Sequence, residues 1–472
     1  MKYTFKIFFR RLRRIIVALI LFSFVLCVAA ALYIIIAGFP QWMVSAVTNR
    51  LSEGQLYIEA DSIRFDPGRG FIITDMIVFR DGVVGPPAAE VEKVLIVPDF
   101  KAALKNRLAV RKAILNGSIV RPEFAISSRT SGEQHFNTYG DFDLEMNDTD
   151  VMDLHIPKLR CRMEIEGPEV RVINAVSTLG SGEAAWNIDH RMDTALMKGK
   201  GRTSFDLTLL IPVFKGLNMN EQARLLSDFR FHKRMPRTEF TYTRLCKSNG
   251  FFNIEGSFWM ENCRFRRVDT ERIDGNIRGS FSPSTSNVRV DDLLVARKEG
   301  ILRGNFEVDA LNSTVRFEGN SSLHPRALAR IVDVYPTNLM NQLSFKGPVN
   351  IDAGGRINYR QPENSDIQAE VKAEKLGLRM FTADTCSFRL RSTGITNYLT
   401  GISGEIYDGA FSGNCRFDLP YRSRTNIAYA CNGTIQKANF DRIVRAVTTN
   451  EAWDTRGDFT LDLEISGLMG ED

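Results

Sequence analysis

Alternation of apolar and polar residues with a period of two is the feature that most constrains the fold of this chain. In segment 458–466 every second residue from Phe459 to Ile465 is apolar, and the residues between them are polar. Successive side chains of a β-strand point to opposite faces, so this segment predicts a strand with one apolar and one polar face. Many similar short runs, separated by Gly, Asn, Asp and Pro, predict a mostly β protein. Helical spacing is confined to four short segments: 99–107, 220–229, 326–334 and 438–447.

Two further segments give more specific predictions. Residues 204–211 alternate in the same way, which predicts a strand with Phe205 and Leu207 on its apolar face. Asn249-Gly250 lies between two alternating runs, at 241–248 and 251–258. Because Asn and Gly tolerate positive φ, this dipeptide predicts a two-residue hairpin turn.

A second hairpin can be placed in register around Ser423. A turn centred there pairs three residues of strand 411–419 with three residues of strand 425–433, all apolar or cysteine: Leu419 with Ile427, Phe417 with Tyr429, and Cys415 with Cys431. Facing residues of antiparallel strands lie about 4.5–5.5 Å apart at Cα, which is within reach of a disulfide. We predict that the two cysteines are neighbours, and the sequence leaves open whether they are bonded.

An internal repeat relates segments 300–309 and 409–418. In both, a second Gly follows the first by four residues, and an Asp follows the second Gly by five. A strand and then a short helical segment follow each copy. The repeat predicts sheet units stacked side by side into an elongated body, with chance recurrence as the alternative.

Residues 15–37 carry no charge, whereas residues 1–14 contain six Lys and Arg and no acid. A helix of this length spans roughly 35 Å, enough for a hydrocarbon core of about 30 Å. The basic stub places the N-terminus in the cytoplasm, with everything after a single-pass signal anchor across the membrane. A cleavable signal peptide is the alternative, since Ala29–Ala31 are small, although its apolar stretch is usually only about 7–15 residues.

Charge and motif content exclude several functions. The chain has 61 Lys and Arg against 56 Asp and Glu; without the six cations of the stub, 55 face 56. A neutral body has no electrostatic footprint for nucleic acid. No catalytic or metal-binding motif is present, so we expect no enzyme, no cofactor and no metal site. The acidic residues in 141–150 fit a solvated loop better than a calcium site.

Several segments resemble the AsmA-like envelope protein family, at both ends of the chain and only weakly over 190–290. The similar segments are Gly54-Gln55-Leu56-Tyr57-Ile58, residues 63–71, 91–96, 115–124 and 132–137, and Tyr407-Asp408-Gly409-Ala410-Phe411-Ser412-Gly413. The resemblance implies an inner-membrane anchor and a periplasmic β-sheet curled into a groove. It also implies a relation to bridge-like lipid transfer proteins that support outer-membrane homeostasis.

Charge, the apolar span, the internal repeat and the resemblance together give a domain division: a cytoplasmic stub at 1–14, an anchor at 15–37, an N-terminal AsmA-like region at 40–150, a middle region at 151–290, and a repeated region at 291–472 with copies at about 291–340 and 400–450. Family members usually continue beyond the last strand, so the resemblance implies a truncated chain or a short member. The expected partners are the inner membrane, lipid acyl chains, and an outer-membrane or periplasmic protein at the far end.

Residues on apolar strand faces are the candidates for lining the groove. They are Phe205, Leu207, Phe306, Val308, Val315, Phe317, Phe411, Phe417, Leu419, Ile427, Tyr429, Phe459, Leu461 and Leu463. Acyl chains would lie against them away from water. A non-catalytic envelope scaffold would instead pack the same residues into a closed β core. A hydrolase or glycan-binding module would need converging polar groups, for which the sequence offers no candidates.

Overall fold

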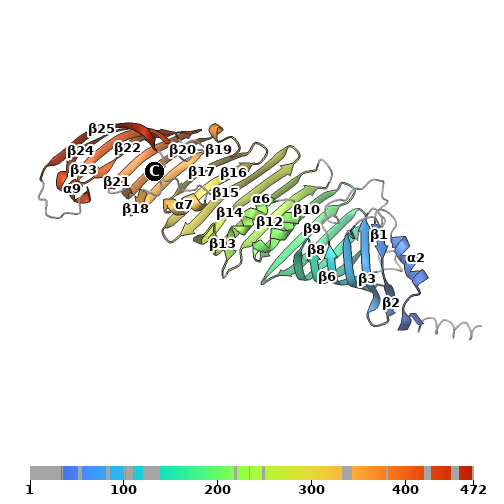
Figure 1. Ribbon diagram of the computed structural model, residues 1–472. Coiled ribbons are helices and arrows are strands. Elements are labelled where there is room, and N and C mark those ends of the chain that lie inside the picture. Colours follow the sequence, from blue (N-terminus) through green and yellow to red (C-terminus); the bar gives the residue numbers. More distant parts are fainter. Residues whose placement is uncertain are drawn as a thin grey trace, which may run out of the picture. The chain divides into compact units, whose positions relative to one another are not determined.

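The computed structural model describes residues 33–34, 36–51, 56–80, 86–99, 101, 110–120, 139–216, 220–232, 234–246, 250–331, 343–378, 381–418, 427–447 and 456–469. Over these residues the protein is mostly β (Figure 1), with 25 strands in an open, largely antiparallel sheet and a few short helices. The predicted fold class, mostly β with few short helices, is confirmed at this level.

Contacts divide the chain into two compact units, Met1–Met197 with Leu209–Ala223, and Lys198–Thr208 with Arg224–Asp472. Unit 1 contains the helix α2 (Gln41–Leu51) and the strands β1 (Leu56–Glu59), β2 (Ser62–Asp66), β3 (Gly70–Arg80), β4 (Ala89–Pro98), β5 (Val110–Val120), β6 (Tyr139–Val151), β7 (Leu154–Glu166), β8 (Glu169–Leu179) and β9 (Gly182–Arg191). Consecutive strands from β2 onward pair antiparallel, except that β5 and β6 pair in parallel. The chain passes between the units through β10 (Leu196–Ser204), η1 (Leu207–Leu210), α5 (Ile211–Gly216) and α6 (Asn220–Ser227).

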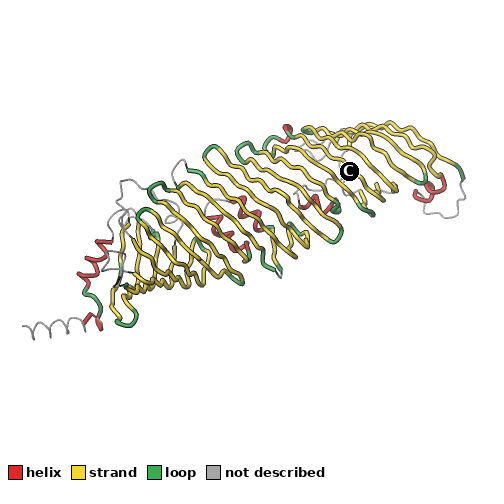
Figure 2. Tube along the Cα trace, turned by 180° about the vertical axis from the view of Figure 1, so that it is seen from behind, coloured by secondary structure: helices red, strands yellow, loops and turns green. Residues whose placement is uncertain are grey.

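Unit 2 is a succession of antiparallel strands (Figure 2). A short α-helix follows the β16–β17 pair and another follows the β23–β24 pair. Its elements are β11 (Phe229–Phe231), β12 (Arg237–Leu245), β13 (Phe252–Phe265), β14 (Val268–Ser282), β15 (Thr285–Arg297), β16 (Gly300–Asp309), β17 (Thr314–Ser321), α7 (Pro325–Ile331), β18 (Leu343–Phe345), β19 (Val349–Asn358), η2 (Pro362–Asn364), β20 (Asp366–Leu378), β21 (Phe381–Thr393), β22 (Thr396–Ile406), β23 (Gly409–Asp418), β24 (Ile427–Asn439), α9 (Phe440–Val447) and β25 (Asp458–Met469). The short strands β11 and β18 pair with β13 and β20.

Many strands are interrupted by one residue with positive φ. In unit 2 these residues are Asn262 on β13, Asp292 on β15, Lys375 on β20, Gly401 on β22 and Lys437 on β24. The register shifts around Asp292, Gly401 and Lys437, as expected for β-bulges. Bulges bend a strand and increase its twist, so each adds local curvature to the sheet of unit 2.

The helices agree with the sequence at three of four predicted positions. α6, α7 and α9 lie within or across 220–229, 326–334 and 438–447, whereas most of 99–107 lies outside the described residues. The strand predicted over 204–211 is wrong, because η1 and α5 occupy it. Asp206 Oδ1 accepts hydrogen bonds from the Thr208 backbone N–H at 2.9 Å and from its hydroxyl at 2.6 Å, which starts the helical turn.

Two other local predictions are corrected. β12 and β13 form the expected hairpin, but Arg244 pairs with Phe252, so the connection is longer than the predicted two-residue turn at Asn249-Gly250. The solvated loop expected at 141–150 is the strand β6. Its acidic residues alternate with Phe142, Leu144 and Met146, and this period-two pattern prevails over the high charge.

The described part of the chain contains no helix that is both long enough and apolar enough to span a bilayer. The predicted stub at 1–14 and almost all of the predicted anchor at 15–37 lie outside the described residues.

Candidate functional site

The register of unit 2 aligns apolar residues into continuous rows that cross the strands. One row, here called the aromatic row, passes from β12 to β20 through residues that are each paired with the next: Phe240, Gly256, Ile277, Val290, Phe306, Phe317, Gly355 and Ile367. Beside it runs the valine row: Tyr242, Ile254, Gly279, Val288, Val308, Val315 and Ile357. Since paired residues share a face, both rows belong to one apolar face.

The opposite face of the same strands is charged. Along each strand from β13 to β20, the residue next to the aromatic-row residue, on the side of the valine row, points to this opposite face. These residues pair from strand to strand and are here called the charged row: Glu255, Arg278, Arg289, Glu307, Arg316, Arg356 and Asp366. Arg289 Nε donates to Asp291 Oδ1 at 2.5 Å, and this bond raises the pKa of the arginine. The sheet of unit 2 therefore separates an apolar face from a charged face over many consecutive strands.

The apolar face is only partly shielded from water. Every large side chain of the aromatic and valine rows is half-buried. Full burial on this face occurs toward one margin, where Met260, Cys263, Ile273, Val295, Leu302 and Leu323 form a cluster packed against residues of β11 and α7. A closed two-layer core would bury both rows to the extent seen in this cluster, so the rows lie on an open surface.

Burial shifts the pKa of three titratable groups in unit 2. Burial raises the pKa of the Tyr242 phenol, which belongs to the valine row. Burial likewise raises the pKa of the Cys263 and Cys386 thiols, so both stay protonated and unreactive at neutral pH.

The aromatic row continues through β21 to β25. Ile367 pairs with Ser392, Ser392 with Asn397, Asn397 with Phe417, Phe417 with Tyr429, and Tyr429 with Gly467. Asn397 is 7% exposed, and its amide donates to the Ile395 and Phe417 carbonyls at 3.1 and 3.4 Å. These bonds let a polar residue occupy the apolar face without a buried unpaired amide.

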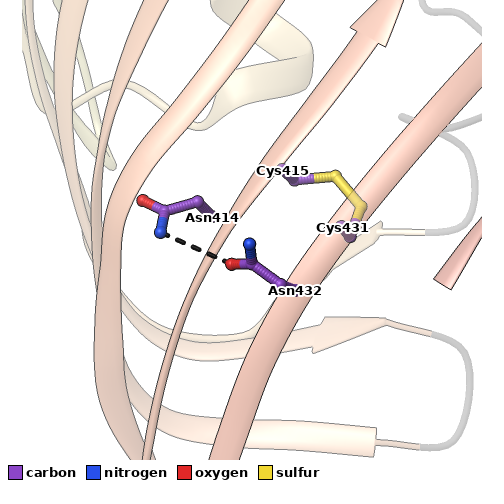
Figure 3. Close-up of a disulfide and its surroundings, with 4 residues drawn as sticks. All are labelled: Asn414, Cys415, Cys431 and Asn432. Atoms are coloured by element: carbon purple, nitrogen blue, oxygen red, sulfur yellow. Dashed lines mark hydrogen bonds between the residues drawn. A yellow bond between two sulfur atoms is a disulfide. The ribbon is translucent and has the colours of Figure 1, made fainter. Parts of the chain in front are cut away.

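A disulfide joins Cys415 on β23 to Cys431 on β24 (Figure 3). The two cysteines and the pair Phe417–Tyr429 have the register predicted from a turn centred on Ser423. The adjacent pair, Asn414 and Asn432, has an amide–amide hydrogen bond of 3.5 Å. The turn itself, with Leu419, lies outside the described residues.

The structure places most candidate lining residues on this face. Phe306 and Phe317 lie in the aromatic row, and the same row continues to Phe417 and Tyr429. Val308 and Val315 lie in the valine row, while the remaining candidates occupy β23 to β25: Phe411, Ile427, Phe459, Leu461 and Leu463. Phe205 and Leu207 are corrected: Phe205 is 2% exposed, and Leu207 begins η1, so neither lines a strand face.

Several residues of this apolar face are not predicted by the alternation of apolar residues in the sequence. On β14 the apolar face consists of Ile273, Gly275, Ile277, Gly279 and Phe281. Glycine alternates with apolar residues there, which hides the face from a search for apolar side chains. The sequence pattern that indicates this face is glycine and apolar residues together at every second position.

The charged face has a cavity of about 510 Å³ near the bulge at Asp292, lined in part by Arg303, Asn305, Glu318 and Asp352. Asn305 accepts the Asp292 backbone N–H at 2.9 Å and donates to Glu318 at 2.8 Å, so its amide is used structurally. Among the described residues, no group of three or more His, Cys, Asp or Glu could hold a metal ion.

The chain was compared with protein-family models, curated proteins and solved structures, and none of the three comparisons gave a match.

Proposed function

We propose that this chain is an AsmA-like, membrane-anchored periplasmic protein whose β-sheet binds lipid acyl chains and helps them cross the cell envelope. In this proposal residues 15–37 anchor the chain in the inner membrane, with the N-terminus in the cytoplasm. The apolar face of unit 2 lines a groove for the acyl chains. The half-burial of the aromatic and valine rows is the single observation that carries the proposal.

The energetics of the open face favour a long apolar ligand. Half-buried Phe306, Phe317 and Val308 leave apolar area in contact with water, which an acyl chain would remove. Each buried methylene contributes roughly 0.8 kcal/mol, so a 16-carbon chain gains on the order of 10 kcal/mol before the cost of its immobilisation. The rows cross the strands, so a ligand that follows them can pass from strand to strand without breaking polar contacts.

Site-specific photocrosslinking tests the proposal. Benzoylphenylalanine is introduced at Phe306, on the aromatic row, and the full-length protein is irradiated in native membranes. We expect crosslinked phospholipid to be recovered by mass spectrometry from this variant. The matched control is benzoylphenylalanine at Arg316, which lies on the charged row of the neighbouring strand β17.

Lipid recovered equally from both positions would indicate nonspecific contact and contradict the proposal. Absence of lipid from the Phe306 position, in a protein that also carries none after purification in mild detergent, would favour the envelope scaffold.

A further inference from the structure

The helix α2 of unit 1 exposes an uncharged face that carries a tryptophan. It packs against β1 and β2 (Figure 1), and its residues Val44 and Thr48, one turn apart, are buried. On its exposed side Trp42 is 70% exposed and Val47 is 45% exposed. Residues 41–49 contain no charge. An exposed tryptophan on an uncharged helix face is typical of a contact surface, where the amphipathic ring lies between water and an apolar phase.

The chain reaches α2 directly from the apolar segment 15–37. The described residues just before Gly38 are helical, and the Gly38 N–H donates to the Ile34 carbonyl at 3.1 Å. Gly38 has a φ of +85°, so it ends this helix as a C-terminal cap. The next residue, Phe39, donates its N–H to the Ile63 carbonyl of β2 at 2.7 Å. The end of the apolar segment is therefore attached to the sheet just before α2 begins.

A cation and further exposed apolar residues lie at the same place. A Cβ on Gly38 would lie 3.0 Å from Cγ of Arg64, so this exposed arginine of β2 packs over the cap. Tyr33 and Ile36, in the helical turn before the cap, are 55% and 75% exposed. Aromatic rings and arginines at the end of an apolar helix are typical of a membrane–water interface, where they anchor the helix at headgroup level.

We propose that α2 lies on the surface of the membrane, with Trp42 and Val47 among the lipid headgroups and Arg64 beside lipid phosphates. This inference rests on the proposed function, because it requires residues 15–37 to span the bilayer. Since α2 begins four residues after this segment, it starts within about 14 Å of the segment's end. The sheet of unit 1 would then begin at the bilayer surface, with β1 and β2 held there by α2.

Tryptophan quenching tests the inference on the full-length protein in lipid nanodiscs. The chain has four tryptophans, and the test variant keeps Trp42 while Trp186, Trp259 and Trp453 are changed to Phe. We expect phosphatidylcholine brominated near the top of its acyl chains to quench the emission of Trp42 by about half, because the ring lies at headgroup depth. Acrylamide, a quencher dissolved in water, should have a smaller effect.

The matched control has Val176→Trp together with Trp42→Phe and the same three other changes. Val176 is 42% exposed on β8 of the same unit, and five strands lie between β8 and β2. At roughly 4.8 Å per strand this separation is about 29 Å. We expect the brominated lipid to leave this tryptophan unquenched and acrylamide to quench it strongly.

The same assay tests the phosphate contact of Arg64. Brominated phosphatidylglycerol should quench Trp42 more than brominated phosphatidylcholine does, because the cation gathers anionic lipid around α2. Arg64→Gln should remove this difference. Arg69→Gln is the control, because this exposed arginine of the β2–β3 turn already has Asp66 as a partner at 3.9 Å, and it should keep the difference. An equal response of Arg64→Gln and the parent would contradict the phosphate contact.

Three results would overturn the inference. Quenching of Trp42 by acrylamide and not by brominated lipid would place α2 in water. Protection from both quenchers would mean that a protein, such as a second copy of the chain, covers the helix. Equal lipid quenching of the Trp42 and Val176→Trp variants would mean that α2 is not the specific contact.

The inference and the proposed function can fail separately. Quenched Trp42 in a protein that crosslinks no lipid at Phe306 would retain the membrane contact of α2 and contradict the groove. Crosslinked lipid at Phe306 with Trp42 exposed to water would retain the groove and contradict the contact. Release of the chain from native membranes by alkaline carbonate would contradict both, because the anchor would be absent.

Discussion

Glu145, on β6 in unit 1, is a carboxylate surrounded by cations from both neighbouring strands. Its side chain is 14% exposed, and its oxygens lie 2.8 Å from Lys112 Nζ, 3.4 Å from Lys158 Nζ and 3.4 Å from the Arg160 guanidinium. The hydrogen bond from Lys112 is the main cause that lowers the pKa of Glu145 from 4.5 to about 2, with burial opposing it. Because the folded pKa lies below the unfolded value, the carboxylate stabilises the fold above pH 4.5 and loses this effect as the pH falls toward 2.

The substitution Glu145→Gln should therefore lower stability at neutral pH and have little effect in strong acid. We expect a loss of about 2 kcal/mol at pH 7, reduced from the full pKa shift because water reaches the cluster. Urea denaturation at pH 7 and at pH 2 measures the difference. The control Asp141→Asn removes an exposed partner of Arg162 on the same strand and should change stability by less than about 0.5 kcal/mol. A loss of equal size at both pH values would contradict the role given to the charge.

At the residue scale, the sequence predicts the positions of residues that depend only on strand pairing within one hairpin. Cys415 and Cys431 were placed because one choice of turn centre aligned apolar pairs along both strands. Phe205 was misplaced because alternation over a few residues does not distinguish a strand from a helical turn capped by Asp206. The sequence does not predict the cations around Glu145, because they lie on the other strands β5 and β7. The parallel pairing of β5 with β6 cannot be recognised from local sequence.

Three β-bulges have the same side-chain hydrogen bond, here called the Asn latch. Asn187, Asn305 and Asn414 each lie five residues after the glycine that begins their strand. Their side-chain oxygens accept the backbone N–H of the positive-φ residue on the preceding strand: Asn174 at 2.6 Å, Asp292 at 2.9 Å and Gly401 at 3.0 Å. The latch pairs an N–H that the bulge removes from the strand ladder.

Removal of one latch should weaken its bulge locally. We expect Asn414→Ala to cost about 1–2 kcal/mol, since the Gly401 N–H loses its acceptor. Faster amide exchange in β22 and β23, with other strands unaffected, is the measurement. The control Asn320→Ala changes an exposed Asn on β17 and should cost less than about 0.5 kcal/mol. Unchanged exchange in Asn414→Ala would show that the bulge does not need the latch.

The sequence predicts which segments are strands or helices better than it predicts how these segments are connected. The repeat at 300–309 and 409–418 corresponds to the strands β16 and β23, and each is followed by a strand and a short helix. The second glycine of each copy pairs with a glycine of the next strand, Gly304 with Gly319 and Gly413 with Gly433. A Cβ at Gly304 would lie 2.5 Å from the Glu318 carbonyl oxygen, so the spacing has a steric cause that one copy alone does not reveal.

Each unit is built almost entirely from pairings between strands that are neighbours in the sequence. In unit 2, β12 to β17 pair in strict order, and β19 to β25 do the same. Contacts of this kind make stability a sum of local terms, as in repeat proteins. A destabilised strand should then loosen its neighbours and leave distant strands unchanged.

Val295→Ala tests this locality. Val295 on β15 is 3% exposed within the buried cluster, and loss of its methyl groups should cost about 2 kcal/mol. We expect faster amide exchange in β14 to β16 and unchanged exchange in β21 to β25. Val288→Ala, on the same strand but half-buried in the valine row, is the matched control and should have a smaller effect. A uniform increase along the chain would mean cooperative unfolding of the whole sheet. A local increase would mean that the sheet can open at one strand while the rest of it stays folded.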